Sequence, residues 1–183
     1  MGKTHDASLN PHYDFESPDN LREIAAVEAY DILSDNQTYM AGQEVSSPWG
    51  KNQVLKVWME GQTEFCLKRI TINPHSMLSL QRHRARAEQW FVMEGRLTVI
   101  LDGKKITVEK GHDISIPLGS VHCMINETGE AVVVEEIQKG ICREKDNIRL
   151  KDFLGRATYP LTSEVELQSY HHYCDVMNSI NKA

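Results

Sequence analysis

The sequence lacks the features that would place the protein in a membrane or on a nucleic acid. No apolar run approaches the roughly 20 residues that a membrane-spanning helix needs, and the first 20 residues hold no apolar core of a secretory signal. No basic stripe with interleaved aromatic residues is present, and 26 acidic residues outnumber 20 basic ones. We therefore expect no nucleic-acid partner, no membrane partner and a cytoplasmic location.

Cysteine is also scarce, with four residues in the chain. None of them forms a CxxC pair, and Cys66 and Cys123 lie in strand-like runs. We expect small buried thiols rather than disulfides or zinc ligands.

Acidic charge is concentrated at the start of the chain. Residues 1–44 hold nine acidic side chains against two basic ones, whereas the remainder is close to neutral. A length of 183 residues suits one domain with arms rather than two domains. The acidity therefore belongs to an N-terminal arm.

From about residue 51 to residue 138 the chain consists of short β-type runs broken by turn signals. Asp102-Gly103 between two apolar runs is a strong hairpin signal. No long helix interrupts the runs, so the pattern excludes a parallel α/β sheet and indicates an antiparallel sandwich or barrel. Helices are predicted over 21–33 and, as a closing element, over 163–182. The predicted strands are 52–58, 65–73, 78–83, 88–94, 96–102, 104–109, 112–116, 121–126 and 131–138.

Histidine and carboxylate side chains occur at spacings that suit a metal. Gln81 and His83 share one face of a predicted strand because side chains alternate, and Glu88 opens the next strand. His122 follows some forty residues later, and neutral imidazoles with a carboxylate suit Zn²⁺, Fe²⁺ or Mn²⁺. The surrounding pattern is Gly111-x5-Pro117-x-Gly119-x2-His122-x3-Asn126.

This spacing resembles the two cupin motifs. His83, Glu88 and Gly95 fit the first, and the segment 111–126 fits the second at every fixed position. The resemblance implies an all-β double-stranded β-helix jelly roll with a metal inside its mouth. We accordingly predict an acidic arm with one helix at 1–44, a cupin jelly roll at 45–140, and a C-terminal extension at 141–183 that packs on the barrel.

Longer segments resemble a narrower family, the C-terminal type II mannose-6-phosphate isomerase domain of bifunctional mannose-1-phosphate guanylyltransferase/mannose-6-phosphate isomerases. The resemblance covers residues 48–156. The segments that carry it are PWG (48–50), FCLKRITINPHSMLSLQRHRARAEQWFVMEG (65–95), ISIPLGSVH (114–122), EEIQKG (135–140) and IRLKDFLGR (148–156).

Ala85 stands where the second histidine of the first cupin motif would be. Gln81 can supply the missing oxygen ligand, and the set Gln81, His83, Glu88 and His122 resembles the zinc site of phosphomannose isomerases. We therefore expect one divalent metal ion, with zinc first and Mn, Fe, Co or Ni as alternatives. Two further departures from the family are Gln89, in place of a usual histidine, and the turn at 142–145, in place of a tyrosine-bearing acidic turn.

Basic side chains are the candidates for binding a phosphate. Lys68 shares strand parity with Ile70 and Ile72, so it faces the core if they do. An inward lysine is costly unless an anion meets it, and either an internal carboxylate or a substrate phosphate could do so. The resemblance adds Arg86, Arg149 and Arg156 as candidate substrate contacts.

Glu136 and Gln138 share parity with Val132 and Val134, although the opposite face of that run is apolar as well. The pattern therefore does not decide whether these two side chains point inward. If they face the cavity, Gln138 is a candidate substrate contact, and Glu136 and Lys68 are the candidate general bases.

The resemblance implies a metal-dependent isomerase that interconverts mannose 6-phosphate and fructose 6-phosphate through an enediolate. One alternative is a non-catalytic cupin that binds a sugar or sugar nucleotide. Another is a cupin oxygenase with iron on His83, Glu88 and His122, against which Gln81 in place of a histidine argues. We expect a phosphorylated hexose as substrate and a homodimer, since a jelly roll has exposed edge strands.

Overall fold

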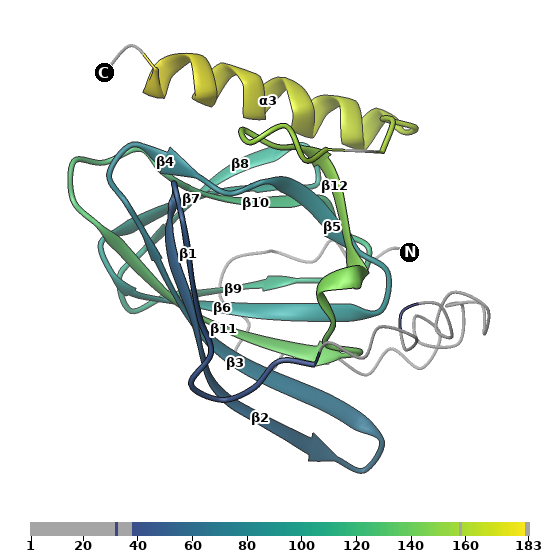
Figure 1. Ribbon diagram of the computed structural model, residues 1–183. Helices are drawn as coiled ribbons and strands as arrows, with labels where there is room; N and C mark the ends of the chain where they lie inside the picture. Colours follow the sequence, from purple (N-terminus) through teal and green to yellow (C-terminus); the bar gives the residue numbers. More distant parts are fainter. Residues whose placement is uncertain (1–31, 33–37, 158, 182–183) are drawn as a thin grey trace.

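The computed structural model describes residue 32, residues 38–157 and residues 159–181. The helix predicted over 21–33 lies outside these residues apart from Ile32, which is helical and buried. Two antiparallel sheets face each other, and a C-terminal helix covers the outer face of one of them (Figure 1). The predicted all-β jelly roll with a tail helix is confirmed.

The first sheet carries the longest strands and supplies one wall of the site. Its strands β3 and β11 pair over nine residues, and their burial alternates along the chain as expected for a sheet with one face inward. In order across the sheet, the strands are β1 (Glu44–Ser47), β2 (Gly50–Glu60), β3 (Thr63–Ile72), β11 (Val132–Gly140), β6 (Arg86–Glu94) and β9 (Asp113–Ile116).

The second sheet lies opposite the first. Its β7–β8 hairpin turns at Asp102 and Gly103, whose φ angles of 45° and 75° match the predicted tight turn. In order, the strands are β12 (Asn147–Lys151), β5 (Leu80–His83), β10 (His122–Asn126), β7 (Arg96–Leu101) and β8 (Lys104–Glu109), with β4 (Ser76–Met77) paired to β10.

Each of the nine predicted strands corresponds to an observed one, while β1, β4 and β12 were not predicted. The main core lies between the sheets and includes Trp90 of β6 and Leu97 of β7. A second apolar cluster lies under the helix α3 (Glu164–Ile180), where Tyr173 meets Leu80 and Ile125. Helix α3 therefore buries the outer face of the second sheet in part, whereas most side chains of β8 remain exposed.

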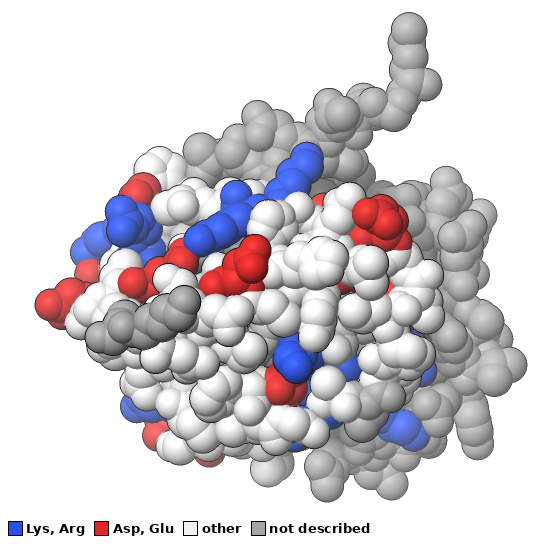
Figure 2. Space-filling model, turned by 90° about the horizontal axis from the view of Figure 1, so that it is seen from above, with Lys and Arg blue, Asp and Glu red and all other residues white. Residues whose placement is uncertain are grey.

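Helix α3 begins with a capping box, in which Ser163 and Glu166 satisfy each other's backbone N–H groups. Arg82 of β5 reaches Glu166 with an Nε–Oε1 distance of 3.1 Å, and the Gly103 amide donates to Ser169 Oγ at 2.9 Å. Seen from above, the described surface carries acidic and basic side chains interspersed (Figure 2). No helix among the described residues is long and apolar enough to cross a membrane.

A short 3-10 helix, η1 (Glu144–Asp146), connects β11 to β12. The Asp146 side chain is fully buried, and its Oδ1 accepts hydrogen bonds from the backbone amides of Arg84 and Ala85. This connection therefore ties the turn between β5 and β6 to the start of β12.

Candidate functional site

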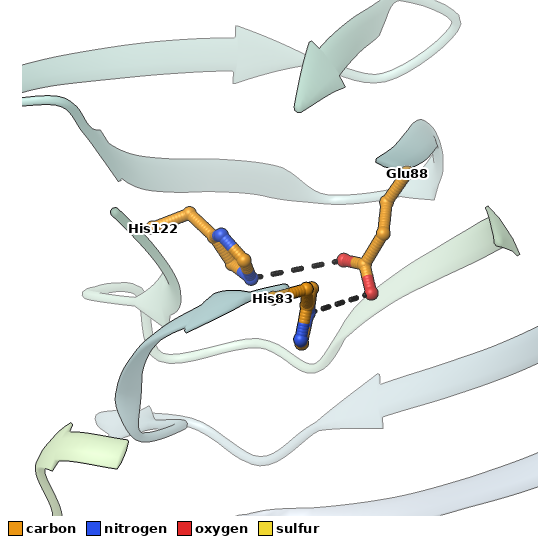
Figure 3. Close-up of side chains that lie close together, drawn as sticks. All are labelled: His83, Glu88 and His122. Atoms are coloured by element: carbon orange, nitrogen blue, oxygen red, sulfur yellow. Dashed lines mark ion pairs between the residues drawn. The ribbon is translucent and has the colours of Figure 1, made fainter. Parts of the chain in front are cut away.

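Three side chains from three strands converge between the two sheets. His83 ends β5, His122 begins β10, and Glu88 points toward them from β6 of the opposite sheet (Figure 3). Their candidate ligand atoms lie within 4.8 Å of one another. Nε2 of His83 is 2.9 Å from Glu88 Oε1, and Nε2 of His122 is 3.8 Å from Glu88 Oε2. The sequence prediction thus identified side chains that the fold brings together.

The Glu88 carboxylate is held in place by three hydrogen-bond donors. Arg86 Nε and Gln138 Nε2 each donate to Oε1 at 3.2 Å, and Trp90 Nε1 donates to Oε2 at 3.0 Å. Burial acts to raise the pKa of Glu88, but His83 and Arg86 outweigh it and hold the pKa well below its ordinary value. Glu88 is therefore a carboxylate that is fixed in orientation and ionised.

Both histidines are buried and neutral at physiological pH. Burial, and then the charge of Arg86, lowers the pKa of His83 to about 3, and burial lowers that of His122. His122 Nδ1 donates to the Ser120 carbonyl at 2.9 Å, which leaves its Nε2 as an acceptor. That Nε2 atom is buried without a hydrogen-bond partner. An orphaned imidazole nitrogen beside a second histidine and an ionised carboxylate fits a divalent metal.

The positions at which the sequence analysis expected a substitute ligand or a departure from the family lie around this cluster. Gln81 lies opposite His122 in the β5–β10 register, and its Oε1 accepts a hydrogen bond from Ser79 Oγ at 2.9 Å. Ala85 is fully buried and its amide is bound to Asp146. Gln89 points to the face of β6 opposite Glu88, where it meets Ser115. This departure from the family therefore lies away from the metal cluster.

A cavity of about 360 Å³ opens beside the cluster. Every other residue proposed from the sequence lines it together with Glu88: Lys68, Gln81, Arg86, Glu136, Gln138, Arg149 and Arg156. The open question about strand β11 is thereby answered, because Glu136 and Gln138 both face inward and are 5% and 1% exposed.

The Arg86 side chain is buried and binds several polar groups inside the site. It is 2% exposed, and besides Glu88 its guanidinium contacts Asp146, Asn147 Oδ1 and the Arg143 carbonyl at 3.3, 2.9 and 2.8 Å. Burial alone would lower the pKa of Arg86, but Tyr39 and the surrounding carboxylates outweigh burial and raise it. Arg86 is therefore the permanent counter-ion of Glu88.

Glu136 and Gln138 form a second polar pair on β11. Gln138 Nε2 donates to Glu136 Oε1 at 2.7 Å as well as to Glu88, so one amide bridges both carboxylates. Burial, followed by the charge of Glu88, raises the pKa of Glu136 to about 8. A carboxyl group with this pKa can both accept and return a proton near neutral pH.

The remaining basic side chains of the cavity differ in their partners. Lys68 is 5% exposed, and its Nζ lies 3.5 Å from the centroid of the Tyr39 ring. Arg149 pairs with Glu144 of η1, and Arg156 Nε pairs with Asp152 at 2.5 Å. The arginines therefore line the cavity as ion pairs, whereas Lys68 lines it beside an aromatic ring.

Sequence reasoning missed several residues of this site. Trp90 could have been found, because it shares strand parity with Glu88. Tyr39 and Asp146 carry no local signal, since their hydrogen bonds reach segments about 60 to 105 residues away in the chain. Glu144 meets Tyr39 over the same distance, although it also pairs with the nearby Arg149.

Comparisons with known proteins show similarity in sequence and in fold. The family described as mannose-6-phosphate isomerase, C-terminal, matches residues 34–152. A mannose-1-phosphate guanylyltransferase of Escherichia coli is 36% identical over 132 residues, which cover 70% of this chain and 27% of that protein. The alginate biosynthesis protein AlgA of Pseudomonas aeruginosa is 37% identical over 118 residues, covering 64% and 24%. The chain thus spans about a quarter of the length of these relatives.

A solved structure supports the fold alone. Rru_A2000 of Rhodospirillum rubrum, a cupin-2 domain, has a TM-score of 0.51 and 18% identity, covering 78% of this chain and 94% of that one. The jelly roll therefore has the fold of this cupin-2 domain. Because the family match covers well over half of its residues, the chain belongs to the family of mannose-6-phosphate isomerase C-terminal domains.

Proposed function

We propose that the protein is a metal-dependent aldose–ketose isomerase that interconverts mannose 6-phosphate and fructose 6-phosphate. The observation that carries the proposal is one cavity lined by Glu88 of the His-Glu-His cluster, by the hydrogen-bonded Glu136 and by the buried Lys68. Metal, proton acceptor and cation are the parts that such a reaction needs.

His83, Glu88 and His122 would hold the metal, with Gln81 as a further oxygen donor from the same cavity. When bound, a divalent ion supplies Lewis-acid polarisation of a carbonyl group. The three donors to Glu88 keep this ligand in one orientation, and burial excludes bulk water from the cluster.

Glu136 is the general base of the proposal. Its carboxylate takes the proton from C2 of the open-chain aldose and returns it to C1, while the proton of the C2 hydroxyl moves to the C1 oxygen; the two transfers together convert the aldose into the ketose. Gln138 holds Oε1 of Glu136 and thereby fixes the direction in which the carboxylate presents its other oxygen. A raised pKa suits a group that must both accept and return the proton.

Lys68, Arg149 and Arg156 are the proposed contacts for the phosphate. All three line the cavity, and a charge-assisted bond from lysine or arginine to a phosphate contributes about 1.5–3 kcal/mol. Arg149 and Arg156 would have to loosen their pairs with Glu144 and Asp152, whereas Lys68 has no ion pair with any of the described residues.

A coupled assay for fructose 6-phosphate tests the proposal, with Zn²⁺, Mn²⁺ and Co²⁺ added in turn to the metal-free protein. We expect turnover with at least one metal, and its loss in Glu136→Gln at unchanged metal content. Lys68→Met should lower kcat/KM for mannose 6-phosphate roughly ten- to a hundredfold and leave mannose unaffected. Absence of turnover in a fully metal-loaded protein would refute the isomerase.

The second candidate is a non-catalytic cupin that binds a sugar or sugar nucleotide. The ion pairs of Arg149 and Arg156 favour it, because both cations already have carboxylate partners. Under this alternative, calorimetry with the metal-loaded protein shows sugar binding while the coupled assay shows no conversion.

A further inference from the structure

The Lys68 ammonium is buried in the cavity with an unusual partner. Within the part of the chain that the structure describes, Lys68 forms no ion pair of 4.0 Å or less. Glu136 lies opposite it in the β3–β11 register, but Glu136 Oε1 accepts its hydrogen bond from Gln138. A buried cation without a carboxylate is costly unless another group stabilises it.

The ring of Tyr39 is that group. Its centroid lies 3.5 Å from Lys68 Nζ, within the range in which the negative face of an aromatic ring attracts a cation. A cation–π contact does not neutralise the ammonium as an ion-paired carboxylate would, and Glu136 across the strand pair acts on it from beyond ion-pair distance. The lysine therefore stays a cation that can meet an anion in the cavity.

Contacts independent of Lys68 hold Tyr39 in this position. Its hydroxyl donates to Glu144 Oε2 at 3.1 Å, and its side chain packs against the buried cluster of Val54, Cys66 and Cys142. The neighbouring Thr38 forms a β-bridge with Arg143. The segment before β1 is thus attached to the turn before η1, and the ring forms a wall of the cavity.

We propose that Tyr39 is a positioning residue for anion recognition, whose ring holds the Lys68 ammonium in the cavity toward the phosphate of the substrate. The inference rests on the proposed function, because it takes a phosphorylated sugar as the ligand. It makes the Tyr39–Lys68 pair the determinant that separates phosphorylated from unphosphorylated sugars.

The test compares Tyr39→Leu with the matched control Tyr39→Phe in the metal-loaded full chain. The leucine removes the ring, whereas the phenylalanine keeps it and removes only the hydroxyl. Calorimetry measures binding of mannitol 6-phosphate and of mannitol, which lack the carbonyl group and so are not converted. We expect Tyr39→Leu to weaken mannitol 6-phosphate roughly two- to thirtyfold, with mannitol unchanged and Tyr39→Phe close to the parent.

Three results would overturn the inference. If Tyr39→Leu and Tyr39→Phe lose the same affinity for mannitol 6-phosphate, the effect comes from the hydrogen bond to Glu144. If Tyr39→Leu loses the same affinity for mannitol 6-phosphate and for mannitol, the effect comes from packing. If Tyr39→Leu keeps the same preference for mannitol 6-phosphate over mannitol, the ring has no role in anion recognition.

Lys68→Met separates failure of the inference from failure of the proposed function. If Lys68→Met retains the full preference for mannitol 6-phosphate, the phosphate contact of the proposed function is wrong. If Lys68→Met removes the preference and Tyr39→Leu does not, only the role of Tyr39 is wrong. Adding Tyr39→Leu to Lys68→Met should have no further effect, because the two residues act through one contact.

Discussion

Replacing Arg86 by methionine should destabilise the metal-free protein more than any other single loss of charge around the cavity. The methionine keeps much of the apolar stem but removes the guanidinium that is 2% exposed. Glu88 and Asp146, themselves 1% and 0% exposed, then lose their shared counter-ion. The Asn147 and Arg143 oxygens lose their donors at the same time.

The magnitude follows from the burial of both partners. Removing one member of a buried ion pair costs about 3–5 kcal/mol, because the remaining charge is left uncompensated. For a domain of this size about 1 kcal/mol corresponds to 2–4 °C, so the midpoint of thermal unfolding should fall by roughly 6–20 °C. Arg86→Lys keeps the charge but loses the forked geometry of the guanidinium, so its midpoint of thermal unfolding should lie between those of the parent and Arg86→Met.

Chemical denaturation of the metal-free protein at pH 7 measures this loss. Arg82→Met is the matched control, because its Nε lies at a similar 3.1 Å from Glu166 but its side chain is 32% exposed. Partly exposed pairs contribute about 1 kcal/mol or less. A loss in Arg86→Met no larger than that in Arg82→Met would refute the assignment of Arg86 as the permanent counter-ion of Glu88.

Three further expectations concern ligation, thiols and pH. His122→Ala should abolish stoichiometric metal binding and Gln81→Ala should only weaken it, since imidazole is the better ligand; equal metal content by elemental analysis would contradict this. Burial raises the pKa of Cys66 to about 11, so iodoacetamide at pH 8 should alkylate the half-buried Cys174 first, and mass spectrometry that finds Cys66 modified earlier would refute it. The folded pKa of Glu136, about 8, exceeds its ordinary 4.5, so the folded state holds a proton that the unfolded state releases, and stability falls as pH rises through this range. Denaturation at pH 5 and pH 8 should show a smaller fall in Glu136→Gln, and identical falls would count against the shift.

The strand framework and the metal cluster were accessible from the sequence because both are encoded by short periodic patterns. Alternation placed Gln81 and His83 on one strand face, and the spacing around His83, Glu88 and His122 matched two motifs with fixed internal distances. The hairpin at Asp102-Gly103 was equally local, since a tight turn demands particular residue types.

The unpredicted parts depend on partners distant in the chain. Strand β12 is a five-residue run with charged residues, and it becomes a strand because β5 offers a free edge 64–71 residues away. The inward direction of Glu136 was ambiguous because both faces of β11 carry apolar side chains, Val132 and Val134 on one and Val133 and Ile137 on the other. The contact of Tyr39 with Lys68 depends on how the segment before β1 crosses the cavity, which no local spacing records.

Strand β5 has one further consequence, because its last two residues face opposite sides of the sheet. Arg82 is bound to Glu166 of α3, and His83 belongs to the metal cluster. Any opening that pulls β5 out of the sheet must therefore release the helix contact and the ligand together. A metal that binds only the closed strand lowers the population of such openings, as any ligand of the native state does. Amide hydrogens of α3 that exchange through this opening should then exchange more slowly in the metal-loaded protein, so the helix and the metal behave as one cooperative unit although no ligand comes from the helix.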